Sequence, residues 1–427
     1  MSQWLQQVID RGQAIDDWLS PLRAEALETL SNTNWPNRRV ESWKYTSLAP
    51  LEKLELTASN TAGNTVEKAA NKAFIDSIEG LNSLDLVFVD GKLQNDISLL
   101  PLLAGLHISS FQDAAVKEQN TANALFAKIK PQRHLFGLIN DALAVDGLII
   151  DIAADSEIEQ PIRIVNISTD GQESHHRILV RLGNNAKATV IEEGQGEQAS
   201  LNTSFAEYEI GEHAYLEHYR LAMHTHQAIH IGGCHFSLLQ QAELNSTLIA
   251  YGSELSRLDI DIIHNGEHAK AKFNAVYLLG ESEQFTLHST IEHAVPNGTT
   301  EENARGIIGD KAKAVFNGRI HIHRDAQKTL AELNNRNLLL SRRGQINTKP
   351  ELEIYADDVQ CAHGATVAET EEETLYYLCS RGISRSQALV MLNFGFIQEL
   401  VNQMPNQHLA LWLKPQLKSR FVEMEVK

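Results

Sequence analysis

From about residue 140 onward, the chain consists of short β-prone segments in which apolar and polar positions alternate. Gly, Asn and acidic residues separate these segments, and long stretches with helical spacing are almost absent. Alternation with a period of two is the pattern of strands that bury one face, and each segment is long enough for one strand of roughly five to seven residues. The pattern therefore predicts a mainly β core.

The strand-like segments also repeat. Several open with a turn followed by an alanine, as in GNNAKA, GEHAYL, GEHAKAKF and GDKAKAVF. Openings recur about every 14 residues, so two strands with their turns occupy about 28 residues, which is the pattern of a solenoid. A β-sandwich is the rival interpretation, but it would not explain the shared openings. The alanines of the series are Ala186, Ala199, Ala214, Ala228, Ala242, Ala312 and Ala326.

The segment before residue 140 mixes helical spacing with loops and short extended stretches. Apolar residues recur at helical intervals from Trp4 to Leu22, and a second helical run follows from Ala24 to Leu30. The stretch LDLVFVDGKL predicts a short hairpin that turns at Asp90 and Gly91. This part is expected to be mainly helical.

Helical spacing returns at the C-terminal end. Thr370 with Glu373, and Ser384 with Gln387, have the spacing of capping boxes at two helix starts, and Gly382 is suited to end the first helix. A third, weaker helical run follows. We therefore expect three domains: a mainly helical domain at 1–139, a β-solenoid core at 140–367 and a helical domain at 368–427.

Composition and charge limit the partners and the cellular location that can be expected for this protein. The 427 residues carry a formal charge of −18 with no basic run, so nucleic acid is not an expected partner. No apolar run has the length of a membrane span, and the N-terminal residues lack the pattern of a signal peptide. Three cysteines without a disulfide spacing suit a reducing compartment, so a cytoplasmic location is expected.

Histidines form one dense group and one pair. In HTHQAIHIGGCH, strand alternation would put His224, His226 and His230 on one face, where they could bind a metal. His321 and His323 in RIHIHRD would likewise share a face, as in cupin-type metal sites. The sequence identifies no carboxylate partner for the first group, and neither a carboxylate nor a third histidine for the pair, so a polar outer face of the solenoid is favoured over a metal site. A metal-dependent β-helix or cupin-like enzyme is thus the alternative function.

Cys361 and His363 form the second candidate site, in the stretch ADDVQCAHGATV. In an extended backbone, residues i and i+2 point to the same side, so the thiol and the imidazole would share a face. Both are donors suited to iron and sulfur chemistry, and an imidazolium would favour the reactive thiolate. A structural cysteine that is buried beside a surface histidine would give the same sequence. The residues alone leave both interpretations open, the reactive pair and the structural one.

The sequence resembles a known family over most of residues 140–427. NLLLSRRGQINTKPELEIYADDVQCAHGATV, LYYLCSRGISRSQA and GFIQELV closely resemble the SufB/SufD scaffold subunits of the SUF iron–sulfur cluster assembly machinery. The motif from Asn347 to Thr366 resembles the SufD branch of the family more closely than the SufB branch. ESWKYTSL, from Glu41 to Leu48, resembles the N-terminal signature of the family.

This resemblance implies a right-handed parallel β-helix core flanked by N-terminal and C-terminal helical domains, and a scaffold rather than an enzyme. It implies pairing with a SufB-like subunit through the ends of the β-helix. A nascent iron–sulfur cluster would form transiently at that interface, where Cys361 and His363 would lie, and no cofactor would stay bound to this chain alone. Whether the isolated chain forms a homodimer is left open.

The resemblance also implies a SufC-like ABC-type ATPase docked on the C-terminal helices. Such a partner would explain why the sequence contains no G-x-x-x-x-G-K-[ST] motif. The residues expected to contact it are Tyr376, Tyr377, Leu378, Arg381 and Phe396. Cys379 lies among apolar helix residues and is expected in the core, and neither Cys379 nor Cys234 inherits a role.

Overall fold

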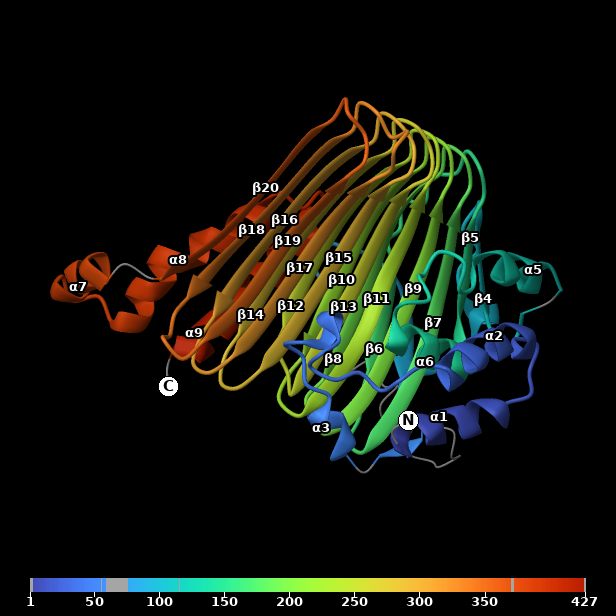
Figure 1. Ribbon diagram of the computed structural model, residues 1–427, viewed down its shortest axis with the longest axis horizontal. Helices are drawn as coiled ribbons and strands as arrows, with labels where there is room; N and C mark the ends of the chain where they lie inside the picture. Colours follow the sequence, from blue (N-terminus) through green and yellow to red (C-terminus); the bar gives the residue numbers. More distant parts are fainter. Residues whose placement is uncertain (1–2, 55, 59–75, 115, 370–371, 426–427) are drawn as a thin grey trace.

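A parallel β-solenoid of about 8 turns forms the centre of the protein, with helices at both ends of the chain (Figure 1). The computed structural model describes residues 3–54, 56–58, 76–114, 116–369 and 372–425. Strands account for 43% and helices for 24% of the chain, so the mainly β core with helical flanks is confirmed.

Two ten-stranded sheets face each other across the interior. Sheet I contains β1 (Thr57–Ala58), β4 (Leu106–Ser110), β5 (Asp146–Ile152), β7 (Gln172–Leu182), β9 (Ser200–Ile210), β11 (Ala228–Leu238), β13 (Leu255–His264), β15 (Gln284–His293), β17 (Lys313–Ile322) and β19 (Gln345–Ile354). Sheet II contains β2 (Leu84–Val89), β3 (Lys92–Leu93), β6 (Ile162–Ile167), β8 (Lys187–Gly196), β10 (Tyr215–His224), β12 (Glu243–Tyr251), β14 (Lys270–Leu279), β16 (Thr299–Ile308), β18 (Leu330–Leu339) and β20 (Gln360–Glu369).

From β5 to β20 the chain alternates between the sheets, and each strand pairs in parallel with the strand two places along the chain. His218 in β10 pairs with Ser246 in β12, 28 residues away, which is the coil length that the repeat predicts. The side chains that point inward from both sheets, mostly Leu, Ile, Val, Ala and Phe, form one continuous buried core. The predicted solenoid is therefore confirmed, and the sandwich is excluded.

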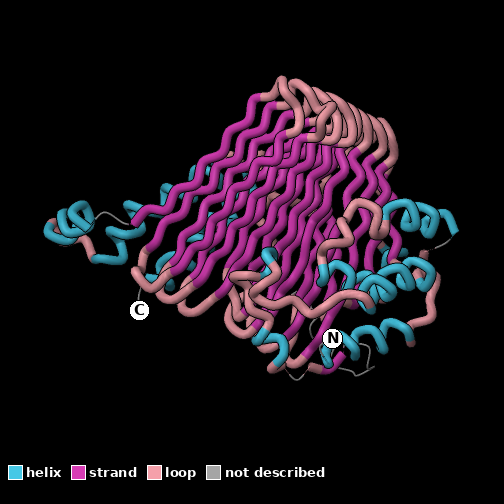
Figure 2. Tube along the Cα trace, in the orientation of Figure 1, coloured by secondary structure: helices cyan, strands magenta, loops and turns pink. Residues whose placement is uncertain are grey.

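The turns stack along the corners of the solenoid (Figure 2). Ala186, Ala214 and Ala242 are fully buried. They occupy equivalent corners, since the residues that follow them, Lys187, Tyr215 and Glu243, pair in register. Ala199 departs from the expected series: Ser200, not Ala199, pairs with Ala228. The uneven steps of the alanine series therefore reflect a shift of one residue at this corner.

Close approach of successive coils explains the glycine that opens several of these turns. A Cβ atom on Gly211 would lie 2.6 Å from the carbonyl oxygen of Leu182, so any larger residue would collide with the backbone of the previous coil. The residue just before the corner alanine adopts the left-handed conformation, with φ of 58° at both Asn185 and His213. Asn and His tolerate this conformation better than most residues.

The N-terminal end of the solenoid is closed by antiparallel strands. Asp90 and Gly91, both with positive φ, join β2 to β3 in the predicted hairpin. β4 pairs with β5 in antiparallel fashion. β2 and β4 fall within the segment that was expected to be mainly helical, yet they belong to the two sheets, so the solenoid core receives strands from before residue 140.

Helices of the N-terminal part pack on the outer face of sheet I (Figure 1). Their apolar residues join those of β9, β11 and β13 in one buried cluster. The helical elements are α1 (Gln3–Gln13), α2 (Ser20–Ser31), η1 (Glu41–Trp43), α3 (Ala49–Glu52), η3 (Ile97–Leu99), α5 (Val116–Leu125) and α6 (Leu135–Leu143).

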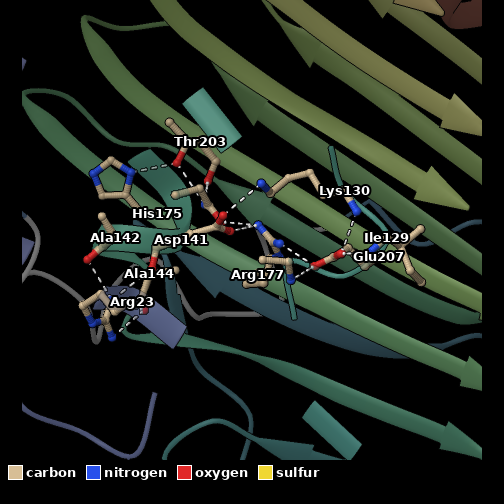
Figure 3. Close-up of polar contacts among 12 residues, drawn as sticks. Arg23, Ile129, Lys130, Asp141, Ala142, Ala144, His175, Arg177, Thr203 and Glu207 are labelled. Carbon is tan, nitrogen blue, oxygen red and sulfur yellow. Dashed lines mark hydrogen bonds and ion pairs between the residues drawn. The ribbon is translucent and has the colours of Figure 1, made fainter. Parts of the chain in front are cut away.

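A buried ionic network fixes this covering to sheet I (Figure 3). Arg177 of β7 lies between Asp141 of α6, at 2.8 Å, and Glu207 of β9, at 2.5 Å. The second oxygen of Asp141 is 2.9 Å from the Lys130 ammonium. The Glu207 carboxylate also accepts backbone N–H bonds from Ala127, Ile129 and Lys130. These partners offset the cost of removing the charges from water.

The C-terminal helices cover the opposite sheet. α8 (Arg385–Asn402) and α9 (Gln407–Glu425) bury apolar residues against the outer face of sheet II. α7 (Glu372–Ser380) projects beyond the strands (Figure 1). Among the described helices, none combines the length and apolar character that crossing a lipid bilayer requires.

Two of the predicted helix signals lie in this region. Ser384 and Gln387 form the expected capping box, and Gly382, with φ of +84°, follows the end of α7. The backbone N–H groups of Gly382 and Ile383 donate to the carbonyls of Cys379 and Leu378, which is a Schellman arrangement. Thr370, the other proposed cap, lies outside the described residues.

Replacing a corner alanine should test the stacking of the coils. Ala242→Leu adds volume to a fully buried corner, so it should lower the free energy of unfolding by about 1–3 kcal/mol through overpacking. Ala199→Leu, at the half-buried corner that is out of register, is the matched control and should cost less. Urea denaturation measures both variants. Equal losses of stability would contradict the assignment of Ala242 to a tightly packed corner and of Ala199 to a position outside that series.

Candidate functional site

The C-terminal end of the solenoid is open. β19 pairs only with β17 and β20 only with β18, so each of these last strands has one edge without a partner among the described residues. Most side chains of β20 are exposed, in contrast to those of the central strands. An unpaired edge of ten residues presents backbone N–H and C=O groups that can pair with another strand.

Cys361 and His363 lie on this last coil, in β20. Cys361 pairs with Ala331 and His363 with Leu333, and both partners are fully buried on the inner face of sheet II. The side chains of Cys361 and His363 therefore both lie on the inward face of β20, at the open end of the core. The structure thus brings the pair to one face, as alternation predicts.

The two side chains differ in exposure. Cys361 is half-buried and packs against the interior core, whereas His363 is exposed. Burial raises the pKa of the Cys361 thiol, and a backbone hydrogen bond with Ala331 only partly offsets this effect. Burial, and not His363, sets the direction of this shift, and the effect of an imidazolium at His363 on the thiolate stays a prediction. A further group near the open end, such as a bound metal or a cationic partner residue, would favour the thiolate.

A buried carboxyl group lies deeper in the same inward column. His363 pairs with Leu333, and Leu333 pairs in turn with Glu302 of β16. Glu302 is fully buried, and the Ser289 hydroxyl donates a hydrogen bond of 2.5 Å to one of its oxygens. Burial raises the pKa of Glu302 to about 7, so the group titrates near neutral pH.

The residues expected to contact an ATPase are arranged on two helices. Tyr376 and Tyr377 are exposed on α7 at 77% and 55% of their surface, and the Arg381 guanidinium lies 5.2 Å from the Tyr377 ring centroid. Leu378 is half-buried on α7. Phe396 lies on α8, half-buried beneath the Arg305 guanidinium of β16. Tyr376, Tyr377 and Arg381 are therefore exposed on and just after α7, whereas Phe396 packs against Arg305 of β16.

Met391 is a further exposed apolar residue of the C-terminal helices, and sequence reasoning missed it. It is 63% exposed on α8, near α7 in the chain. The packing of α8 against sheet II shows which face of this helix remains outside. Cys379, expected in the core, is half-buried and packs against the cluster beneath α8 and α9.

The dense histidine group is arranged differently from the prediction. His224 ends β10 in sheet II, whereas His230 lies in β11 of sheet I, and their rings stack inside the solenoid at a centroid distance of 4.3 Å. His226 is exposed in the turn between them, with φ of 50°. The expectation that the three share one strand face is wrong, because the chain crosses between the sheets within the motif.

His321 and His323 do share a face, as predicted. Their rings stack at 4.6 Å at the end of β17, on the outer side of sheet I. The structure supplies carboxylates that sequence reasoning could not name: Glu292 lies 2.5 Å from His323, and Glu353 lies 3.6 Å from His321. Arg319 also pairs with Glu353, so this carboxylate is already neutralised.

Two buried clusters with metal-ligand donors were missed because their members come from elements that are distant in the sequence. His134 and His235 each place a ring nitrogen within 2.8 Å of Asp261 Oδ2, between α6 and the outer face of sheet I. Glu192, His218 and Cys234 form the second cluster, inside the solenoid. His235 and Cys234 belong to the histidine-rich motif, which was the only sequence signal for either cluster.

The fold and this site define a class of protein, a parallel β-solenoid of two sheets. Antiparallel strands close one end of the solenoid, and a cysteine–histidine pair lies on an edge strand at the open end. Family comparison agrees. The model of the SufBD core domain, described as SUF system FeS cluster assembly, matches residues 165–396, and that of the SufBD N-terminal region matches residues 5–164. The chain therefore belongs to the SufBD family, which confirms the resemblance and supports a role in iron–sulfur cluster assembly.

Individual relatives cover nearly the whole chain. An iron–sulfur cluster assembly SufBD family protein of Synechocystis sp. is 29% identical over 91% of this chain and 88% of its own length. The iron–sulfur cluster assembly protein SufD of Escherichia coli is 28% identical over 91% and 90%, and SufD of Bacillus subtilis is 25% identical over the same shares.

Replacing Glu302 should change how stability depends on pH. Because the pKa of Glu302 is raised from 4.5 to about 7, its contribution to stability is fully present below pH 4.5 and is lost as the pH rises through 7. Relative to Glu302→Gln, the wild type should therefore lose on the order of 3 kcal/mol across this window and stay constant above it. Urea denaturation at a series of pH values measures this difference.

Glu301→Gln, at the exposed neighbouring position, is the matched control and should leave the pH profile of the wild type unchanged. A difference between the wild type and Glu302→Gln that stays constant over the whole series would show that Glu302 has an ordinary pKa.

Proposed function

We propose that the chain is a non-enzymatic scaffold subunit for iron–sulfur cluster assembly, and that the nascent cluster forms transiently at Cys361 and His363. The observation that carries this proposal is their position on the inward face of β20, next to the free edges of both sheets. A thiol and an imidazole are suitable donors to iron. The cluster is cargo here, and no cofactor is proposed to remain on the chain alone.

A SufB-like subunit is the proposed partner at this end. Its end strands would pair with β19 and β20, continue both sheets across the interface and cover the exposed residues of the last coil. Such pairing would bring donors of the partner close to Cys361, and a metal held by both chains would favour its thiolate. An edge that accepts a partner strand can also accept a second copy, so a homodimer of the isolated chain is part of the proposal.

A SufC-like ABC-type ATPase is the proposed partner of the C-terminal helices. Tyr376, Tyr377 and Met391 are exposed there, and aromatic residues beside an arginine are typical of the energetic centre of an interface. Arg381 lies over Tyr377 and would complete this centre.

Motion of the ATPase could reach the solenoid through buried contacts. Arg305 of β16 donates to the carbonyl oxygen of Phe396, at 2.5 Å, and pairs with Glu399 of α8, at 2.8 Å. Arg420 of α9 forms an ion pair with Glu283, just before β15. In the proposed mechanism, closure of the ATPase on ATP pulls on these helices, shifts the end of the solenoid and exposes Cys361 and His363.

The enzyme alternative has less support from the geometry. His224 and His230 are each only 1% exposed inside the solenoid, so their rings offer no surface to an organic substrate, and His226 is separate from them. His321 and His323 are accessible, but Glu353 beside them is paired with Arg319. These histidines therefore do not converge on an open site with free ligand atoms.

His363→Ala should abolish cluster formation in the reconstituted complex of this chain with SufB-like and SufC-like partners. His363 is exposed, so the free energy of unfolding should change by no more than about 0.5 kcal/mol. We expect Cys361→Ser to reduce the yield less, because a partner can supply thiolates but has no obvious substitute for the imidazole. Cluster absorbance and a melting curve are recorded for each variant.

Gln360→Ala, exposed on the same edge strand, is the matched control for complex formation and should keep the full yield. A normal cluster yield with His363→Ala would remove this residue from the proposed mechanism.

Replacing Tyr376 and Tyr377 together by Ser should weaken ATPase binding by about 10- to 100-fold, as expected for the loss of two central aromatic residues. These exposed substitutions test the interface better than deletion of the C-terminal helices, because α8 and α9 also cover apolar residues of sheet II. Isothermal titration with the ATPase measures the affinity. Leu411→Ser, on a 62% exposed residue of α9, is the control, and equal effects of both changes would contradict the assigned dock.

A further inference from the structure

A compact set of metal-ligand donors lies inside the solenoid, far along the chain from Cys361. Glu192 comes from β8, His218 from β10 and Cys234 from β11, so the set joins both sheets. Oε1 of Glu192 lies 3.0 Å from Nε2 of His218 and 3.3 Å from Sγ of Cys234. All three side chains are at least 99% buried, and their ligand atoms lie within 4.8 Å of one another.

The surroundings orient these donors as in a metal site. Nδ1 of His218 lies 2.9 Å from the Ser246 hydroxyl, which fixes the ring and leaves Nε2 directed at the cluster. The Tyr208 hydroxyl donates to Oε1 of Glu192 at 2.6 Å, and Arg220 donates to Oε2 at 2.5 Å. Although burial opposes ionisation, Arg220 and His218 lower the pKa of Glu192 to about 2, so the carboxylate is charged.

A second observation comes from the two stacked histidines nearby. Both ring nitrogens of His224 and Nδ1 of His230 are buried without a hydrogen-bond partner among the described residues. Unpartnered polar atoms inside a protein are uncommon because they lose their hydration without replacement. Nε2 of His230 lies 3.1 Å from Arg220, which contacts Glu192, so the two rings adjoin the donor set.

These rings also lie just inside an acidic groove. The groove, of about 500 Å³, runs between α9 and sheet II, and Thr225 and Gly196 line it next to His224. A Cβ atom on Gly196 would lie 3.2 Å from the His224 ring. Its lining includes the carboxylates of Asp76, Glu197 and Glu423, together with Glu193, which is paired with Arg163, and Arg420, which is paired with Glu283. Carboxylates at the groove would attract a cation towards the imidazoles behind them.

We propose that Cys234, His218 and Glu192 form a binding site for one divalent cation of borderline-soft character, such as Zn²⁺ or Fe²⁺, which enters past His224 and His230. A thiolate, an imidazole and a carboxylate together are the donors that such ions take in proteins. Binding breaks the S–H bond of Cys234 and forms a metal–sulfur bond, and the proton leaves to solvent. The site does not depend on the proposed assembly function, which uses the open end.

Co²⁺, whose thiolate complexes absorb in the near ultraviolet, is the probe for this site. The double variant Cys361→Ser/Cys379→Ser leaves Cys234 as the only cysteine, so any thiolate signal reports on it. Co²⁺ is added without oxygen to the folded full-length chain, and also during refolding from urea in case entry is slow. We expect one equivalent to produce the thiolate band and Zn²⁺ to displace it.

Variants of the donor set decide whether this geometry is responsible. Adding Cys234→Ser to the double variant should abolish the band, and adding His218→Asn should weaken Co²⁺ binding at least tenfold. His213→Asn, at an exposed histidine that does not line the groove and whose positive φ suits Asn, is the control and should bind as the double variant does. Melting curves with and without Zn²⁺ identify any variant that fails to fold.

Absence of the band after refolding with Co²⁺ would overturn the proposal, as would unchanged affinity in a folded His218→Asn variant. Because the double variant already lacks Cys361, neither result bears on cluster assembly at the open end. Conversely, a normal cluster yield with His363→Ala would leave this inner site untouched.

Discussion

In-register stacking of coils is the constraint on which the rest of the structure depends. Each inward side chain lies against its equivalent in the next coil, and each central strand satisfies its backbone hydrogen bonds through the strands of the coils on either side. A solenoid built in this way must treat its two ends differently from its middle. Antiparallel strands close the first end, whereas the last strands of both sheets stay unpaired in the described chain. The candidate assembly site lies where this stacking stops.

Charged groups inside the protein occur where separate parts of the chain meet. Arg177 joins Asp141 and Glu207, and so fastens the N-terminal helices to sheet I (Figure 3). Inside the solenoid, Arg220 and Glu192 form a second buried pair. Replacing such pairs by apolar residues is often neutral or stabilising in proteins, so stability alone is a weak reason for their presence. The first pair specifies how the domain docks, and the second surrounds the proposed cation site.

The two outer faces of the solenoid carry different coverings, and this separates their roles. N-terminal helices cover sheet I near the closed end, while α8 and α9 cover sheet II and continue to α7 beyond the strands (Figure 1). The helices that cover sheet II are connected to the open end, since α7 is the next described element after β20. A force applied to α7 and α8 would therefore act on the last coils through Arg305, and the closed end would serve as the fixed part.

The sequence by itself determined the solenoid, its coil length, the hairpin at Asp90 and Gly91, and the shared face of Cys361 and His363. These features depend on local alternation and on a repeat, both of which can be read along the chain. Only the tertiary structure decided which histidines meet, because His224 and His230 come from opposite sheets, and which carboxylates face them. It likewise decided that Cys361 is half-buried with a raised pKa. The contacts between these side chains depend on distances between residues that are far apart in the sequence. The burial and the pKa of Cys361 depend on how far packing removes water from around the thiol.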